Sequence, residues 1–358
     1  MTNVSPNLLK TKQHFNILDG LRGVAALAIV AFHFMEVVFE FSKNVLGHGF
    51  LAVDFFFCLS GFVIAYAYDD RLGKMGIMEF FKSRVIRLHP LVIFGSVLGL
   101  LTFLFDPFSG TAAAYSIGKI TLLFLTSALL IPFPTMEDRY FNNFGLNAPA
   151  WSLFWEYVAN IFYAFVLYRL PKKYLIVLVF IAAAILISVA YQAGSLLGGW
   201  AGENFWEGGA RIFYSFLAGL IIYRYNWIIK NKLGFVGLSI LLLLAFFMPY
   251  SAYNWLTETF VVLIYFPLLV SLGAGTAATQ GLHKLCIFSG KISYPLYMTH
   301  YMAIWVFANY YNTYKPEGIK LALVISCGLV ALVSLAYLTM ILFDIPIRKY
   351  LSKKRINA

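Results

Sequence analysis

Residues 17–41 of the chain read ILDGLRGVAALAIVAFHFMEVVFEF. A helix that crosses a bilayer needs about 20 predominantly apolar residues, and this run is long enough. It is too long for the apolar region of a signal peptide, and it contains Asp19, Arg22 and His33, which such peptides lack. The segment therefore predicts a retained transmembrane helix that carries ionisable groups.

The composition extends this prediction to the whole chain. Of the 358 residues, 61% are hydrophobic and only 12% are charged, whereas soluble domains carry about 25% charged residues. Too little polar surface is available to cover a soluble core, and disorder, collagen and coiled coil are excluded as well. The chain is therefore expected to be a polytopic membrane protein.

The net charge is +11, from 27 Lys and Arg against 16 Asp and Glu. The basic residues cluster at the ends of apolar runs, as in 169–173 and 348–355. This pattern is typical of cytoplasmic loops that face anionic lipid headgroups. We therefore expect membrane lipids as partners, and no nucleic acid.

Eleven apolar segments are candidates for membrane helices. They lie near 17–41, 50–68, 88–105, 116–132, 149–169, 173–193, 210–225, 233–249, 257–274, 292–310 and 319–342. Lys10, Lys12 and the basic 69–87 loop should be cytoplasmic, and so should the basic loops 169–173, 226–232 and 276–291. The loops near the N-terminus and the loops counted back from the C-terminus are all cytoplasmic only if an even number of segments crosses. Of the eleven segments, one within 88–132 should therefore cross only partly or re-enter.

The predicted fold is an all-α, polytopic membrane helical bundle with about ten transmembrane helices plus one re-entrant or partial helix. Residues 1–358 should form a single domain, with both termini cytoplasmic. The longer loops 133–150 and 194–209 should face outward, and both are rich in aromatic residues, Asn and Gly. Such loops are candidates for a substrate entrance.

Several common site types find no support in the sequence. The three cysteines Cys58, Cys286 and Cys327 lie far apart and form no CxxC pair, so they predict neither a disulfide framework nor a zinc site. HExxH, Walker A and nucleophile-elbow motifs are absent, as is a GxGxxG motif on a strand. No metal site is predicted.

Ionisable groups inside a bilayer are costly and are functional candidates by default. Arg22 and His33 are eleven residues apart, which places them on one helix face about 16 Å apart along the axis. Asp19 and Glu36 fall on the same face, three residues before Arg22 and after His33. The alternatives are an arginine at a helix end that extends to the interface and a histidine packed in the bundle.

The next segments add further candidates. In 49–62, GFLAVDFFFCLSGF, Asp54 either has a buried role or caps the helix start, and Ser60-Gly61 allows close approach of another backbone. Arg84 and Arg87 lie at i and i+3 and form a fork suited to phosphate, unless they belong to an ordinary basic loop.

Two later segments carry polar groups at helical spacing. Ser152 and Glu156 lie at i and i+4 beside Trp151, where an interfacial aromatic anchor is the alternative. Ser293, Tyr297 and His300 share a face near the C-terminus, where the alternative is a packed polar seam.

Taken in order, these motifs resemble the acyltransferase family 3 of integral membrane acyltransferases. The matching pieces are LDGLRG at 18–23 with His33, DFFFCLSGF at 54–62, RVIR at 84–87 followed by LHP, WSL at 151–153 with Glu156, and SYPLY at 293–297 with His300. They cover nearly the whole chain. Each is weak alone, whereas the ordered set is specific.

The resemblance implies an enzyme that takes an acyl group, usually acetyl, from cytoplasmic acyl-CoA. The acceptor would be a hydroxyl of an extracytoplasmic saccharide or glycolipid, and acyl-CoA would be a co-substrate with no permanently bound cofactor. It also implies a multi-pass protein of the bacterial inner membrane. Some family members carry a fused SGNH domain, for which we expect no room here.

On this basis we expect His33 to be the general base, or alternatively to form an acyl-histidine. Asp19 or Glu36 could orient its ring, and Glu156 could instead be the partner from another helix. Arg22, Arg84 and Arg87 would hold the CoA phosphates. The expected substrate-binding residues are Trp151, Ser152, Ser293, Tyr297 and His300.

The main alternative is a secondary transporter or flippase for a lipid-linked saccharide. Such a protein would also have about ten helices and buried charges. It would move a saccharide without consuming acyl-CoA.

Overall fold

The computed structural model describes residues 14–277 and 281–357, so the predicted cytoplasmic residues Lys10 and Lys12 lie outside the described part. Within those ranges the chain is helical, with one isolated β-bridge between Asn142 and Ala201 and no β-strand. The helices are α1 (Asn16–Val38), α2 (Ala52–Tyr68), α3 (Leu72–Met75), α4 (Ile77–Leu104), α5 (Ile117–Ala128), α6 (Ala150–Phe165), α7 (Lys172–Ala193), α8 (Phe205–Arg224), α9 (Gly234–Phe246), α10 (Asn254–Phe260), α11 (Phe266–Ala274), α12 (His283–Thr299), α13 (Tyr301–Tyr314), α14 (Gly318–Thr339) and α15 (Ile345–Asn357).

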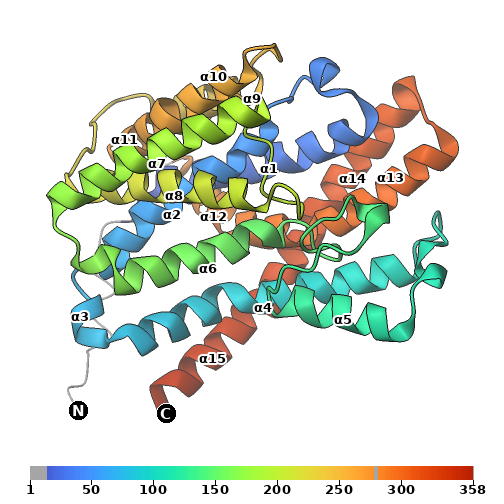
Figure 1. Cartoon of the computed structure of the whole chain (residues 1–358), viewed down its shortest axis with the longest axis horizontal. Helices are drawn as coiled ribbons and strands as arrows, with labels where there is room; N and C mark the ends of the chain where they lie inside the picture. The colour runs from blue at the N-terminus through green and yellow to red at the C-terminus, as the bar shows by residue number, and fades with distance from the viewer. Residues whose placement is uncertain (1–13, 278–280, 358) are drawn as a thin grey trace.

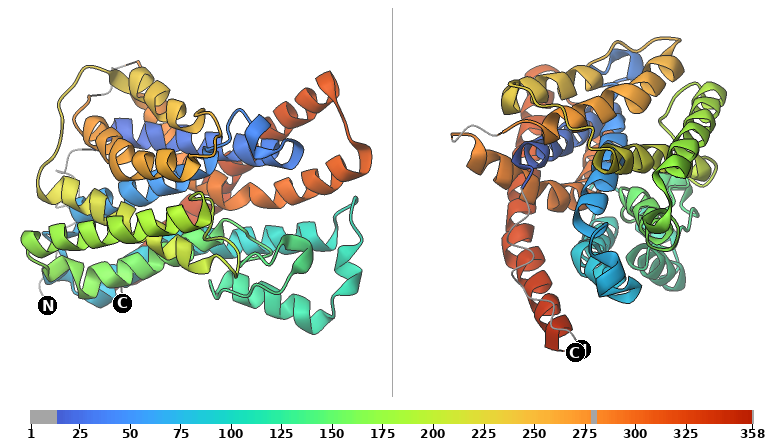
Figure 2. Two further views of the ribbon diagram at one scale, coloured as in Figure 1. Left: turned by 45° about the horizontal axis from the view of Figure 1, so that its top comes forward. Right: turned by 90° about the vertical axis from the view of Figure 1, so that its left-hand side faces the viewer.

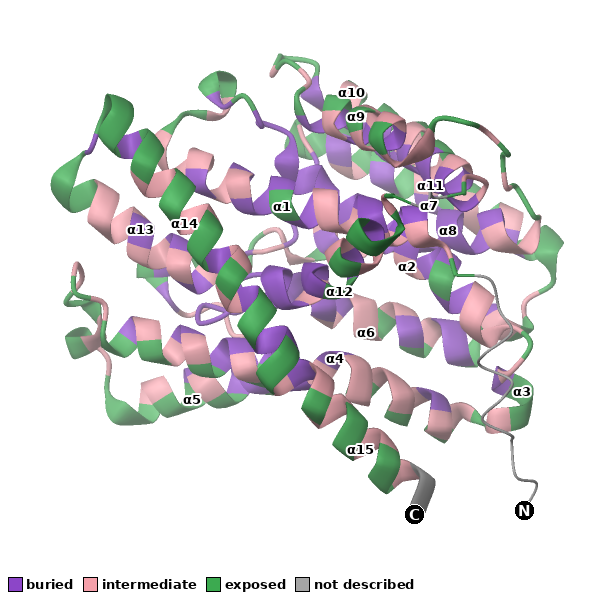
Figure 3. Ribbon diagram, turned by 180° about the vertical axis from the view of Figure 1, so that it is seen from behind, coloured by how far each residue is buried: buried purple, intermediate pink, exposed green. Residues whose placement is uncertain are grey.

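The centre of the bundle is built from α1, α2, α8 and α12. Helix α1 packs along α12, and α2 packs along α8 (Figure 1). The second half of α12 is largely buried, whereas Figure 3 shows exposed residues frequently on α14 and α15. Figure 2 shows α15 extending away from the other helices. The central helices are therefore shielded by others, as expected for the ones that carry polar groups.

The α2–α8 contact depends on two glycines. A Cβ atom added to Gly61 would lie 2.0 Å from the carbonyl oxygen of Phe216, and one added to Gly219 would lie 1.9 Å from that of Cys58. Both separations are far below van der Waals contact, so only glycine allows the two backbones to approach this closely. The close approach predicted at Ser60-Gly61 is confirmed, and its partner is α8.

Six helical segments are long and apolar enough to cross a bilayer. They are Asn16–Val38, Gly49–Tyr68, Ile77–Leu104, Lys172–Ala193, Asn254–Ala274 and Gly318–Arg355. The chain is thus a multi-pass membrane protein, while ten crossings remain a prediction. Helix α5, with 12 residues, would rise only about 18 Å. It lies within 88–132, where a partial crossing is expected.

Several predicted boundaries differ from the structure, and the predicted 276–291 loop is helical from His283 onward. The apolar run 292–310 is not one helix, because α12 ends at Thr299 and α13 begins at Tyr301, so that His300 lies at the junction. Most of the predicted 69–87 loop is helical, because α4 already begins at Ile77. Its early residue Phe80 is fully buried, so packing extends this helix beyond its apolar half.

Candidate functional site

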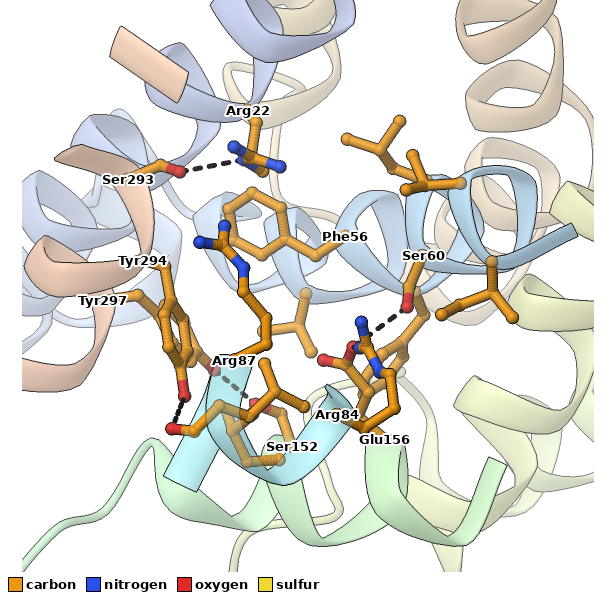
Figure 4. Close-up of a pocket in the computed structure, with 17 residues that line it drawn as sticks. Arg22, Phe56, Ser60, Arg84, Arg87, Ser152, Glu156, Ser293, Tyr294 and Tyr297 are labelled. Atoms are coloured by element: carbon orange, nitrogen blue, oxygen red, sulfur yellow. Dashed lines mark hydrogen bonds and ion pairs between the residues drawn. The ribbon is translucent and has the colours of Figure 1, made fainter. Parts of the chain in front are cut away.

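A cavity of about 190 Å³ gathers the predicted arginines from α1 and α4 (Figure 4). Residues of α2, α6 and α12 complete its wall. Its polar and charged lining residues are Arg22, Ser60, Arg84, Arg87, Ser152, Glu156, Ser293, Tyr294 and Tyr297. Segments that lie up to 275 positions apart in the chain thus form one basic site.

Arg22 is bound firmly to its neighbours. Its Nε donates to Ser293 Oγ at 2.9 Å, and one terminal nitrogen donates to the Gly290 carbonyl at 2.6 Å. Asp19, on the same helix, lies 3.2 Å from that nitrogen. Ser293, a predicted substrate-binding residue, thus contacts Arg22 directly. Asp19, a predicted catalytic residue, lies beside Arg22 as well.

Arg84 is paired as well. Its guanidinium lies 2.7 Å from a carboxylate oxygen of Glu156, and the hydroxyl of Ser60 donates to the same oxygen at 3.0 Å. Three helices, α2, α4 and α6, therefore meet at one carboxylate. Glu156 neutralises the positive charge of Arg84.

Arg87 differs from the other two arginines. Its side chain points toward Arg22 (Figure 4), and within residues 14–277 and 281–357 no hydrogen bond or ion pair to its guanidinium is found. Asp344 acts on the half-buried Arg87 only through space, without a direct ion pair. The basic cavity thus contains one guanidinium whose hydrogen-bond donors are directed at no described protein group, which suits it to an anionic ligand.

His33 lines a different cavity, of about 430 Å³. Its Nδ1 lies 2.5 Å from a carboxylate oxygen of Glu36, and both side chains are mostly buried. A carboxylate on Nδ1 favours the tautomer in which Nε2 is the unprotonated, basic nitrogen. Glu36 is thus the residue that orients the ring, whereas Asp19 and Glu156 make no contact with His33.

Two aromatic rings hold His33 from the side. The His300 ring is stacked on it with centroids 5.3 Å apart, and the Tyr301 ring meets its edge at 4.7 Å. His300 is fully buried and its Nδ1 contacts the Tyr297 carbonyl at 2.7 Å. The helix junction at His300 therefore supports the His33 ring, and His300 does not line either cavity.

The two cavities adjoin. Val53 and Tyr297 line both of them. The Tyr297 hydroxyl and the Ser152 hydroxyl lie 2.8 Å apart, which fixes the tyrosine at the boundary. A passage between the basic cavity and His33 would run past these two side chains.

A buried ion pair that the sequence alone did not reveal lies beside the His33 cavity, where Arg211 forms part of the wall. Arg211 of α8 forms two hydrogen bonds to the Asp54 carboxylate, at 3.1 and 2.5 Å, and lies over the Trp151 ring at 5.2 Å. Asp54 is thus an ion-pair partner, and it makes no side-chain cap for α2. The charged Arg211 within the apolar 210–225 segment was the available clue.

A metal centre finds no support. No group of three or more His, Cys, Asp or Glu residues is placed to hold a metal ion in the described ranges 14–277 and 281–357.

Comparisons with known proteins found one family model and several similar proteins. The model of the family described as "Acyltransferase domain" matches residues 15–341. "Protein 2 in picA locus" of Rhizobium radiobacter is 34% identical over 196 residues, which cover 50% of this chain and 96% of that protein. The O-acetyltransferase OatA of Staphylococcus aureus is 25% identical over 364 residues, which cover 93% of this chain and 57% of that protein.

A putative O-acetyltransferase of Staphylococcus aureus strain COL is 27% identical over 323 residues, covering 82% of this chain and 51% of that protein. The chain thus spans about half the length of the curated O-acetyltransferases that it matches. No solved structure gives a significant match.

Proposed function

The chain belongs to the acyltransferase domain family, and from this premise we propose that it transfers an acetyl group from cytoplasmic acetyl-CoA to a hydroxyl of an extracytoplasmic or lipid-linked saccharide. Family membership makes it a membrane O-acyltransferase. The donor, the acceptor and the sides of the membrane belong to the proposal.

The observation that carries the proposal is the pair of adjoining cavities. One contains Arg87, whose guanidinium forms no direct ion pair among the described residues, and the other contains His33. Val53 and Tyr297 line both. Arg22 and His33 lie on the continuous helix α1, about 16 Å apart along its axis. That spacing is comparable to the reach of the pantetheine arm, so CoA phosphates at Arg87 would leave the thioester near His33.

Charge supports a cytoplasmic position for the basic cavity. The segments that follow α2 and α6 carry basic residues, namely Arg71, Lys74, Arg169, Lys172 and Lys173. The positive-inside rule assigns such loops to the cytoplasm, where acyl-CoA is made available. The His33 cavity, at the other end of α1, would then open toward the acceptor.

The proposed reaction needs one base. Neutral His33 takes the proton from the acceptor hydroxyl through Nε2, and the oxygen attacks the thioester carbonyl carbon. The carbon–sulfur bond breaks, and the CoA thiolate leaves with the proton returned by the imidazolium. The products are an ester and free CoA. Glu36 holds Nδ1–H and stabilises the transient positive charge of the ring.

The test is thiol release from acetyl-CoA by the protein in nanodiscs, with a bacterial polysaccharide hydrolysate as acceptor. His33→Ala should lower the rate about 10²–10⁴-fold while acetyl-CoA binding is retained. Full activity of a folded His33→Ala variant would remove His33 from the reaction. Saccharide transport without thiol release or acetyl-CoA binding would instead favour the transporter alternative.

A further inference from the structure

Beside the His33 cavity lies a second hollow, of about 590 Å³, that the acyl transfer itself does not use. Tyr140 and Trp200 line both, so the hollow continues the His33 cavity. It is lined by Pro134, Glu137, Tyr140, Phe141, Trp200, Gly202 and Glu203. These residues come from the two outer loops on either side of α6 and α7.

Two of the lining aromatic residues are held in a costly backbone conformation. Tyr140 has φ +53° and Phe141 has φ +50°, both in the left-handed region that residues with side chains rarely adopt. Their rings are 69% and 49% exposed, so burial does not explain the conformation. Consecutive strained residues of this kind are typical of functional sites.

Backbone hydrogen bonds between the two loops maintain this conformation. Gly202 N–H donates to the Phe141 carbonyl at 3.1 Å, and Asn143 N–H donates to the Trp200 carbonyl at 2.8 Å. The Asn143 side-chain amide also donates to the Ala201 carbonyl at 3.1 Å. The aromatic rings are therefore presented by a fixed framework, which is what a binding surface requires.

The chemistry of the lining favours an uncharged, hydroxyl-rich ligand. Aromatic faces pack against the C–H face of a sugar ring, and the carboxylates of Glu137 and Glu203 accept hydrogen bonds from hydroxyl groups. None of the seven lining residues is basic. The two carboxylates would repel a phosphate or another carboxylate, which disfavours a lipid headgroup or an acidic glycan.

We propose that this hollow is a second acceptor subsite, which binds the neighbouring units of a neutral oligosaccharide while the reacting hydroxyl lies at His33. The inference rests on the proposed function and goes beyond it, because it assigns the acceptor a minimum length. The enzyme should prefer an oligosaccharide to the corresponding monosaccharide. The preference should depend on the aromatic residues of the hollow.

The experiment compares acceptors of different length. Neutral mono- and tetrasaccharides from cellulose, dextran and chitin are offered to the protein in nanodiscs with acetyl-CoA, and both thiol release and saccharide binding are measured. In wild type the best tetrasaccharide should exceed its monosaccharide in kcat/KM by about tenfold, the effect of one good contact. Phe141→Asn should abolish the difference, because Asn tolerates the left-handed backbone while removing the ring.

The matched control is Trp206→Ala. Like Phe141, Trp206 is an exposed aromatic residue, 77% exposed, but it lies in the first turn of α8 and lines neither the hollow nor the His33 cavity. This variant should retain the length preference. Acetyl-CoA binding reports whether each variant is folded.

Glu203→Gln provides a second, isosteric change in the hollow. Glu203→Gln should improve the use of tetragalacturonate, an acidic probe, relative to the neutral tetrasaccharide.

The outcomes separate the two proposals. Thiol release with equal use of mono- and tetrasaccharides would overturn the subsite and leave the proposed function intact. The same length preference in Phe141→Asn as in wild type would also overturn it. If no acceptor promotes thiol release, the proposed function fails, and binding decides the subsite. Tetrasaccharide binding that Phe141→Asn weakens about tenfold would support it, whereas absent or unchanged binding would overturn it.

Discussion

The Arg211 guanidinium of α8 donates two hydrogen bonds to the Asp54 carboxylate of α2, and the two side chains are 1% and 0% exposed. Two carbonyl groups, of Gly198 and Phe50, accept its remaining hydrogen bonds. The pair thus joins two central helices to the loop before α8. Arg211 lines the His33 cavity, so a pair that holds the bundle together also holds part of the wall of the site.

Breaking this pair should destabilise the protein. Arg211→Met or Asp54→Leu leaves an uncompensated charge in the bundle, which costs about 3–5 kcal/mol when one partner of a buried pair is removed. The double variant should recover much of that loss, because no charge remains unpaired. Unfolding in detergent by heat or denaturant measures all three. Additive losses in the double variant would contradict the coupling.

Helix packing at Gly61 should be equally sensitive. Gly61→Ala places a methyl group 2.0 Å from the Phe216 carbonyl oxygen, so α2 and α8 must separate. Overpacking of this kind typically costs about 1–3 kcal/mol. Gly118→Ala is the control, because its added Cβ meets nothing within 4 Å. Equal melting temperatures for the two variants would show that the close approach is not required.

Substitutions of Arg87 and Arg84 should have different effects, the first on acetyl-CoA binding and the second on stability. Arg87→Ala should raise the KM for acetyl-CoA more than it lowers kcat, by about tenfold or more, since one charge-assisted contact contributes about 1.5–3 kcal/mol. Arg84→Ala should act chiefly on stability, because it leaves the Glu156 carboxylate unpaired. Steady-state kinetics and thermal unfolding of both variants distinguish these effects. A larger fall in kcat than rise in KM for Arg87→Ala would count against phosphate binding.

Glu36 should act as a positioning residue for His33. Glu36→Gln keeps a hydrogen-bond acceptor for Nδ1–H but loses the negative charge that stabilises the imidazolium. We expect kcat to fall about tenfold or more, with the KM for acetyl-CoA and the melting temperature unchanged. Glu156→Gln, at the carboxylate on α6 that does not touch His33, is the comparison. Lower kcat in both variants with unchanged Tm would place Glu156 in the reaction too.

Much of the architecture could be predicted because composition and apolar run length depend on local sequence. The long apolar runs predict helices in a bilayer whatever their neighbours are, and the spacing of Arg22 and His33 places them on one face of α1. The resemblance to a known family follows from ordered motifs, and the match over residues 15–341 confirms it. The break at His300 could not be predicted, because neither Gly nor Pro, the usual signals of a helix end, occurs from 296 to 315.

The partners of most charged groups could not be predicted from the sequence. The sequence by itself determined which ionisable residues enter the membrane and how far apart they lie along α1. Only the tertiary structure decided that Glu156 neutralises Arg84, that Arg211 pairs with Asp54, and that Arg87 has no direct hydrogen bond or ion pair among the described residues. The reason is physical: helical spacing is fixed by local backbone geometry, whereas an ion pair between helices depends on how side chains up to hundreds of residues apart pack together.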